Sequence, residues 1–182
     1  MTPQDLASAT GARIDRATEN LPWIAVAMDS YDINTPERQA AFLAQTSHES
    51  GGFHWLNEIW GPSETQRRYE LRQDLGNNEP GDGFRYRGRG WIQLTGRNNY
   101  RDAYARLKHR FGDQVPDFEM YPDTVATARW AAMTAADFWH SHGCNDLADI
   151  GDFEQITREI NGGLNGYEER QALWKQAKEA LA

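Results

Sequence analysis

The chain has 182 residues, with 27 acidic side chains against 19 lysines and arginines, a formal charge of -8 and a mean hydropathy of -0.80. This length suits one domain with a sizeable core, and the charge argues against a general binder of nucleic acid or of anionic membranes. The sequence has no 18-residue apolar run, so we expect no membrane insertion, and the single Cys144 excludes an internal disulfide.

The first thirty residues are predicted to be helical. Residues 5–30 fit one or two helices, because apolar residues recur at helical spacing, and Asn20 with Pro22 marks a helix start. The buried positions expected from this spacing are Leu6, Ile14, Ala17, Trp23, Ile24 and Val26. The N-terminus has no basic head followed by an apolar stretch, so it does not look like a secretory signal.

Residues 35–53 give the clearest helix signal, and the helix ends on one acidic residue. Thr35 is a good N-cap, and Gly51 with Gly52 can take the left-handed conformation that closes a helix. Glu49 then lies in the last turn, at the negative end of the helix dipole. That position and its apolar neighbours favour a protonated carboxyl group, as a general acid needs. A solvated glutamate at a helix end is the plainer alternative.

The segment after this helix carries a second candidate acid. Helical spacing is lost here, and Glu58 follows nine positions after Glu49, beyond a glycine-rich corner. The two side chains therefore come from different elements and can face each other across a cleft, as acid and base do at a glycosidic bond. Glu64 and Glu70, in a short helix predicted over residues 64–72, compete for the second role.

The middle of the chain is predicted to be irregular and locally basic. A loop rich in glycine and asparagine spans residues 76–83, and residues 84–95 suit a short strand or an extended loop packed on the core. Between residues 61 and 101 there are eight arginines and five acids. We expect most of these arginines to pair with neighbouring acidic side chains.

The rest of the chain is predicted to be helical. Four helices are expected: one that starts at Gly96 or Asn98 and stops at Gly112, a long one capped by Asp123, a short one from Asp152 to Asn161, and a last one from Tyr167 to Leu181. The long helix is apolar over much of its circumference as far as Trp139. It is therefore predicted to be the central helix.

Other kinds of site have little support in the sequence. The histidines of the run His140–Cys144 (HSHGC), like His48 and His54, lack the spacing that places metal ligands on one face. Motifs for a serine or cysteine nucleophile and for a phosphate-binding loop are also missing. The sequence predicts a carboxylate pair that works with no metal and no cofactor.

Three segments stand out as motifs: HESGGF (His48–Phe53), RGRGWIQLTGRNNY (Arg87–Tyr100), and REINGG (Arg158–Gly163) with Arg170 on the helix that follows. Together, and in this order, they resemble glycoside hydrolase family 19, the chitinase-like glycosidases that include phage endolysins. The resemblance implies a mainly α, lysozyme-like fold. In such a fold a helical bundle surrounds a central helix, and a small irregular, β-containing middle region forms the cleft.

The resemblance assigns roles to the matching residues. Glu49 would be the general acid and Glu58 the base that activates water. The residues expected to bind the sugar chain are Tyr69, Gln93, Thr95, Asn99, Tyr100, Asn161 and Arg170. Three further arginines would either orient the acids or meet anionic peptide stems, and we favour the first role for Arg85, Arg87 and Arg89.

The chain departs from the family pattern at two positions. Trp91 stands where the family often has proline. Asn165 stands where the family has an acid, two residues after the last glycine of REINGG, so part of the usual charge network is missing.

The resemblance further implies a single catalytic domain over residues 1–182, without a separate wall-binding module, that cuts β-1,4 bonds of peptidoglycan glycan strands with inversion. A phage enzyme of this type is expected to be a monomer that accumulates in the host bacterial cytoplasm and depends on a separate holin for release. The alternatives are a chitinase, a sugar-binding protein without turnover, and a metal-dependent amidase.

Overall fold

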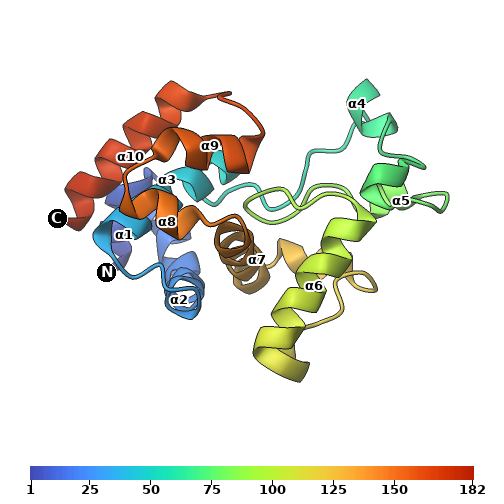
Figure 1. Ribbon diagram of the computed structural model, residues 1–182, viewed down its shortest axis with the longest axis horizontal. Coiled ribbons are helices and arrows are strands. Elements are labelled where there is room, and N and C mark those ends of the chain that lie inside the picture. The colour runs from blue at the N-terminus through green and yellow to red at the C-terminus, as the bar shows by residue number, and fades with distance from the viewer.

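The computed structural model describes residues 1–182 and is mainly helical, as predicted. Its α-helices are α1 (Pro3–Thr10), α2 (Ile14–Ser30), α3 (Pro36–Ser50), α4 (Glu64–Arg67), α5 (Asp82–Arg85), α6 (Arg97–Phe111), α7 (Ala128–Ser141), α8 (Cys144–Asp149), α9 (Phe153–Asn161) and α10 (Tyr167–Leu181). Three short 3-10 turns are η1 (Gln73–Leu75), η2 (Gly112–Gln114) and η3 (Pro122–Ala126). In Figure 1, α1, α2, α3, α8, α9 and α10 gather on one side, α4, α5 and α6 on the other, and α7 between them.

Helix α3 begins and ends where the sequence predicts. The Thr35 hydroxyl accepts the Arg38 N–H at 3.3 Å, and Gly51 closes the helix in the left-handed conformation at φ +60°. Nine of the 15 residues of α3 are buried, and α1, α8, α9 and α10 pack around it. The last turn, which carries Glu49, therefore sits on a rigid base.

The prediction that the long apolar helix is central and buried is confirmed, but the predicted start of this helix is wrong. Nine of the 14 residues of α7 are buried, and α7 packs against α2, α6 and α8. Thr127, however, is the N-cap residue, and Asp123 lies in η3. The Asp123 carboxylate accepts two hydrogen bonds from Arg89 at 2.6 and 3.0 Å, so its role is an ion pair and not a helix cap.

Helix α2 differs from its prediction at Pro22 and on its apolar face. Pro22 lies inside the helix instead of marking a start, since one unbroken helix runs through it. Three of the six residues predicted to be buried are indeed buried, namely Leu6, Ala17 and Ile24. The other three, Ile14, Trp23 and Val26, are 37 to 52% exposed because the helix buries only one stripe.

Of the two forms predicted for the middle of the chain, the structure shows a loop and no strand. Isolated antiparallel bridges join Asn57 to Arg89 and Arg89 to Leu94. The Glu58 N–H donates to the Gly88 carbonyl at 2.8 Å. This pairing places Glu58 beside the RGRG motif. The helix predicted over residues 64–72 is reduced to the single turn α4.

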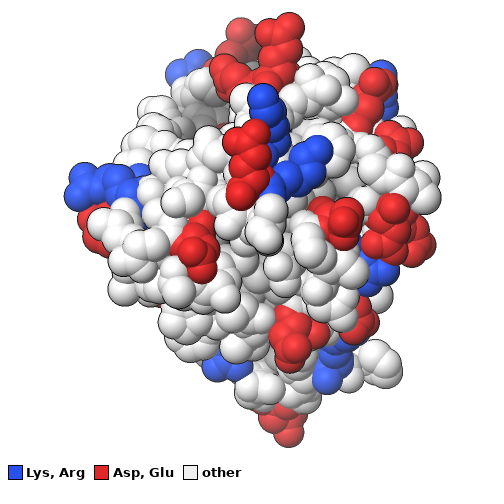
Figure 2. All heavy atoms as spheres, turned by 90° about the vertical axis from the view of Figure 1, so that its left-hand side faces the viewer, with Lys and Arg blue, Asp and Glu red and all other residues white.

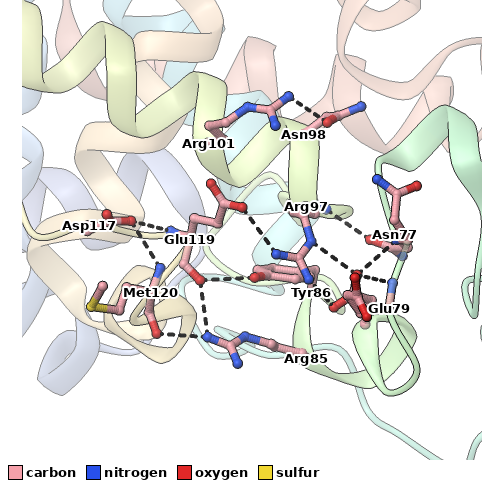
Figure 3. A network of polar contacts seen from close by, with 12 residues as sticks. Asn77, Glu79, Arg85, Tyr86, Arg97, Asn98, Arg101, Asp117, Glu119 and Met120 are labelled. Atoms are coloured by element: carbon pink, nitrogen blue, oxygen red, sulfur yellow. Dashed lines mark hydrogen bonds and ion pairs between the residues drawn. The ribbon is translucent and has the colours of Figure 1, made fainter.

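A network of arginines and acids holds this middle region together, as the sequence predicts. Arg97 on α6 pairs with Asp82 at 2.6 Å and with Glu119 at 3.2 Å. The Tyr86 hydroxyl and the Arg85 guanidinium donate to backbone carbonyls of the segment that contains Glu119 (Figure 3). These contacts fix that segment against α5 and α6.

None of the helices is both long and apolar enough to cross a membrane. Figure 2 looks at the side of the molecule that carries both chain ends. It shows acidic side chains scattered over this face, with Lys and Arg in small separate groups and no broad basic surface.

Candidate active site

Glu49, at the end of α3, is paired with an arginine that comes from the last helix. Arg170 donates to Glu49 Oε1, and its other nitrogens donate to Gln45 Oε1 at 2.6 Å and to the Asn165 carbonyl at 3.2 Å. Gln45 in turn donates to Thr157 Oγ1 on α9 at 2.8 Å. Helices α3, α9 and α10 thus fix one oxygen of Glu49. Oε2 of Glu49 has no hydrogen-bond partner within the protein.

His48, the residue before Glu49, is closely packed and lies among charged side chains, with Nδ1 3.7 Å from Glu169 Oε2. Burial, and then the charge of Arg170, lower the pKa of His48 below its usual value. A Cβ at Gly166, where φ is +69°, would lie 2.6 Å from His48 Nε2. Glycine is therefore needed at position 166 by both its backbone and its contact.

Glu58 is half-buried and accepts hydrogen bonds on both carboxylate oxygens. Oε1 accepts from Gln66 Nε2 at 3.0 Å and from the Tyr69 hydroxyl at 3.4 Å. Oε2 accepts from the Gly88 N–H at 3.0 Å. A carboxylate held from two sides in this way has one fixed orientation.

The two competing glutamates are engaged elsewhere. Glu64 is exposed and forms an ion pair with Arg68 one turn along α4. Glu70 is exposed and accepts the N–H groups of Gly81 and Gly83 at 2.5 and 3.0 Å, where it holds the loop before α5. Glu58 is therefore the one of the three that is braced by Gln66 and the RGRG motif.

Three of the predicted sugar-binding residues line one pocket. Gln93, Thr95 and Asn99 share a hollow of about 300 Å³ with side chains of α6 and the end of α7. Thr95 Oγ1 donates to the Gln93 carbonyl at 2.8 Å, and Asn99 Nδ2 to the Thr95 carbonyl at 2.7 Å. Gln93 takes φ +53°, a left-handed conformation that side chains other than glycine rarely adopt.

The other four predicted sugar-binding residues are placed differently. Tyr100 is fully buried, and its hydroxyl donates to the Arg87 carbonyl at 2.7 Å, so its predicted contact with substrate is wrong. Arg170 is also buried and contacts Glu49 in place of substrate. Tyr69 contacts Glu58. Asn161 has a buried side-chain N–H group with no partner in the protein.

The RGRG arginines do not contact either glutamate, which corrects the favoured prediction for Arg85, Arg87 and Arg89. Arg89 donates to Asp123 and to the carbonyls of Arg85 and Arg87. Arg85 donates to the backbone of Glu119 and the residue after it. The group that does reach Glu58 is the backbone N–H of Gly88.

The structure brings no three potential metal ligands together. His142 of the HSHGC run stacks on Phe138 with ring centroids 3.7 Å apart, and its Nδ1 lies 2.8 Å from the Phe138 carbonyl. Burial raises the pKa of the Cys144 thiol to about 12, so that thiol is a core group.

Comparison with known proteins identifies the family. No protein-family model matches the chain. Over 165 residues the chain is 37% identical to a protein of Haemophilus influenzae described as a glycosyl hydrolase family 19 domain-containing protein, and the match covers 76% of this chain and 77% of that protein. The chain belongs to glycoside hydrolase family 19. It is therefore a glycoside hydrolase with a chitinase-like domain.

Family 19 relatives extend to plants. The chain is 33% identical over 139 residues to acidic endochitinase Q of Nicotiana tabacum, a match that covers 69% of this chain and 51% of the tobacco protein. An endochitinase of Arabidopsis thaliana is 34% identical over 140 residues, 76% of this chain and 44% of that protein. The chain thus spans about half the length of these plant relatives.

Solved family 19 structures share the fold. Chitinase C of Streptomyces griseus has a TM-score of 0.74 at 21% identity and covers 99% of this chain and 76% of its own. A bacterial family 19 chitinase has a TM-score of 0.76 at 21% identity, with 100% and 94% covered. At this identity the likeness shows the fold, and it confirms the predicted lysozyme-like, mainly helical architecture.

Both departures from the family 19 pattern have a structural account. Trp91 is fully buried and packs on Phe53 at 4.7 Å between ring centroids, so it is a core residue below the site. Asn165 accepts a hydrogen bond from Arg170 through its backbone carbonyl, a contact that does not depend on the side chain at this position.

Two site residues were missed by the sequence analysis. Gln66 completes a capping box with Ser63 and also reaches Glu58, and the S-x-x-Q spacing is a signal that could have found it. Gln45 lies one helical turn before Glu49 on the same face, which a helical projection of α3 would have shown.

Proposed function

We propose that this family 19 glycoside hydrolase cuts the β-1,4 glycosidic bonds of bacterial peptidoglycan, with Glu49 as general acid and Glu58 as general base. The observation that supports these roles best is the unequal environment of the two carboxyl groups. Glu49 has one oxygen bound by Arg170 and one without a protein partner, whereas both oxygens of Glu58 are fixed by donors. Paired carboxyl groups with distinct environments are typical of glycosidases.

The proposed reaction follows from these environments. In this reaction Glu49 donates a proton from Oε2, the oxygen without a protein partner, to the glycosidic oxygen as the C–O bond breaks. Glu58 takes a proton from a water molecule that attacks the anomeric carbon from the opposite face. The anomeric centre is then inverted, which requires the two carboxyl groups to stand about 6.5 to 9.5 Å apart in the complex.

The proposed sugar contacts are polar side chains that line the pocket or lack a partner in the protein. Gln93, Thr95 and Asn99 line the 300 Å³ pocket. Asn161, at the end of α9, is partly exposed, and its buried Nδ2 has no acceptor in the protein, so a turn of this side chain toward a sugar hydroxyl or acetamido oxygen would satisfy it. We propose these four as substrate-binding residues.

A chitinase is the second candidate, because the tobacco and Arabidopsis relatives are described as endochitinases. Chitin and peptidoglycan share the β-1,4-linked N-acetylated sugar backbone, so the same two glutamates would serve.

The deciding experiment is mass spectrometry of the products released from purified Gram-negative peptidoglycan, with chitin oligomers in parallel. Disaccharide-peptides that end in reducing N-acetylmuramic acid support the proposal, while cleavage of chitin alone supports the second candidate. Glu49→Gln and Glu58→Gln are each expected to lower kcat by at least about a hundredfold.

The matched control for these variants is Glu64→Gln, which removes an exposed carboxylate that pairs with Arg68. Its activity should equal that of the wild type. If Glu64→Gln loses activity as Glu58→Gln does, or if Glu58→Gln keeps full activity, the assignment of the base is wrong.

The biological setting belongs to the same proposal. A phage endolysin role predicts that the enzyme acts as a monomer, stays in the host cytoplasm during infection and reaches the wall only when a holin opens the membrane. Export of the protein to the periplasm of holin-free cells would contradict this setting without affecting the chemistry.

A further inference from the structure

A hollow of about 520 Å³ lies beside the RGRG motif, away from the pocket of the predicted sugar-binding residues. Exposed apolar side chains form its rim, and arginines form its floor. The lining residues are Phe84, Arg85, Arg87, Arg89, Met120, Tyr121, Pro122, Asp123 and Thr124. This combination of aromatic and cationic groups is one that binds sugars or peptides with anionic substituents.

The floor of this hollow carries an excess of positive charge. Arg89 is buried, and its nitrogens donate to the Asp123 carboxylate, to two backbone carbonyls and to the Tyr100 hydroxyl. Arg87 lies only within 3.9 Å of the same carboxylate. Two guanidinium groups therefore share one carboxylate, and Asp123 already accepts its shorter bonds from Arg89.

Of the two arginines Arg87 and Arg89, Arg87 has few hydrogen-bond partners. Its side chain is only 17% exposed, yet the one hydrogen bond that it donates goes to the Phe84 carbonyl at 3.0 Å. The guanidinium lies over the Phe84 ring at 4.2 Å. Burial, and then the charge of Arg89, lower the pKa of Arg87. A largely buried guanidinium with so few acceptors has donors left for an anionic ligand.

The other arginine in the hollow is already occupied. Figure 3 shows Arg85 directed at the backbone of Glu119 and Met120, and the two bonds measure 3.4 and 3.1 Å. Arg85 therefore builds the wall of the hollow. Arg87 is left as the group that meets a ligand.

The hollow is also next to the proposed base. The residue after Arg87 is Gly88, which donates to one Glu58 oxygen and accepts the Glu58 N–H at 2.8 Å. A ligand group on Arg87 would therefore lie one residue along the chain from the contact with Glu58, close enough for one substrate chain to reach both.

We propose that Arg87 binds a carboxylate on the peptide substituent of the glycan and so makes the enzyme prefer peptidoglycan to an uncharged chitin chain. This inference rests on the proposed peptidoglycan activity and adds the group that selects the substrate. Arg87 acts in substrate binding and has no part in the proton transfers of Glu49 and Glu58.

The test compares three substrates: peptidoglycan glycan strands with their peptide stems, the same strands after an amidase has removed the stems, and chitin oligomers. Wild type, Arg87→Gln, Arg87→Lys and Arg101→Gln are assayed on each, with a thermal melt of every variant. Arg101 is an exposed arginine on α6 that pairs with Asp102 and serves as the matched control.

We expect Arg87→Gln to lower kcat/KM on stem-bearing strands by at least about tenfold more than on chitin oligomers, as for the loss of a charged hydrogen bond. Arg87→Lys should recover part of that loss, and Arg101→Gln should leave the ratio of the two substrates unchanged. Removing the stems should lower the wild-type kcat/KM to that of Arg87→Gln, which tests the inference even where a variant folds poorly.

Two outcomes would overturn the inference in different ways. If the wild type cuts strands with and without stems equally well, Arg87 does not select the peptide carboxylate, while the peptidoglycan activity stands. If the wild type cuts chitin but no peptidoglycan, the proposed function itself fails, and the role of Arg87 fails with it.

Discussion

Glu58 accepts three hydrogen bonds of unequal length, and the longest comes from Tyr69 at 3.4 Å. Burial, and then the Glu58 carboxylate, raise the pKa of Tyr69, so its hydroxyl keeps its proton and remains a donor. Tyr69→Phe should lower kcat by about fivefold, because a hydrogen bond this long contributes only roughly 1 kcal/mol even to a carboxylate. Steady-state kinetics on the cleaved substrate should show an unchanged KM.

The same measurement distinguishes a role of Tyr69 in holding Glu58 from a role in binding sugar. A raised KM with normal kcat would mean that its hydroxyl binds sugar, as the sequence analysis predicted. Tyr104→Phe on α6, where the ring packs on Phe118, is the control and should change neither constant.

The motifs pointed to the residues of the candidate site, but they did not indicate where the side chains of these residues point. The family resemblance pointed to Glu49 and Glu58, and both prove to be braced by other residues. It gave no sign that Tyr100 and Arg170 are buried. Their burial depends on packing between segments far apart in the chain, and such packing cannot be predicted from a short motif.

In the loop that contains the RGRG motif, the side chains of Gln93 and Glu58 lie close to the backbone of Gly88. A Cβ there would lie 2.5 Å from Gln93 Oε1 and 3.3 Å from Glu58 Cβ and Oε2. Gly88→Ala should therefore displace both side chains and lower kcat/KM by about tenfold or more, since small misplacements are costly in catalysis. Its thermal midpoint should fall much less than its activity.

Gly163→Ala provides the comparison for stability. A Cβ at Gly163 meets nothing within 4 Å, so this variant should melt at or slightly above the wild-type temperature. Wild-type activity in Gly88→Ala would show that the loop can shift without moving Glu58, contrary to this account.

Helix positions were predictable wherever the caps are local. Thr35 and Gly51 bound α3, and Asp152 and Gly162 bound α9, because each cap is set by residues within one turn. The predicted start of α7 was wrong because Asp123 pairs with Arg89, 34 positions earlier. The loop that follows α5 likewise depends on a distant segment, because Arg89 forms its bridge with Asn57, while Phe84 and Arg85 belong to α5 and not to the predicted strand or extended loop.

At the scale of the whole molecule, stability should depend on pH through the buried pair of Asp82 and Arg97. Burial raises the pKa of Asp82, but the Arg97 guanidinium and two backbone N–H groups outweigh it and hold the pKa below its usual value. A lowered folded-state pKa adds stability above the unfolded pKa of about 3.9 and loses it as pH falls below that value.

Asp82→Asn should therefore lower the free energy of unfolding by about 2 kcal/mol at pH 7, since it removes the buried carboxylate that Arg97 contacts at 2.6 Å and leaves this guanidinium with Glu119 as its only acidic partner. Urea unfolding at pH 7 and pH 3 should show this difference shrink at the lower pH. Asp113→Asn, at an exposed pair with Lys108, is the control and should show no such change. A difference that is equal at both pH values would contradict the role of the ion pair.

The partner of Glu49 lies 121 residues further along the chain, on α10, where Arg170 is also bound by Gln45. Helix α10 packs on both α1 and α3. During synthesis the glutamate motif is therefore made long before the guanidinium that orients it, and a shortened or nicked chain has a glutamate with no partner. With Glu49 as the proposed general acid, we expect full activity only once α10 has been made and has docked, so that the order of folding itself delays the enzyme's first turnover.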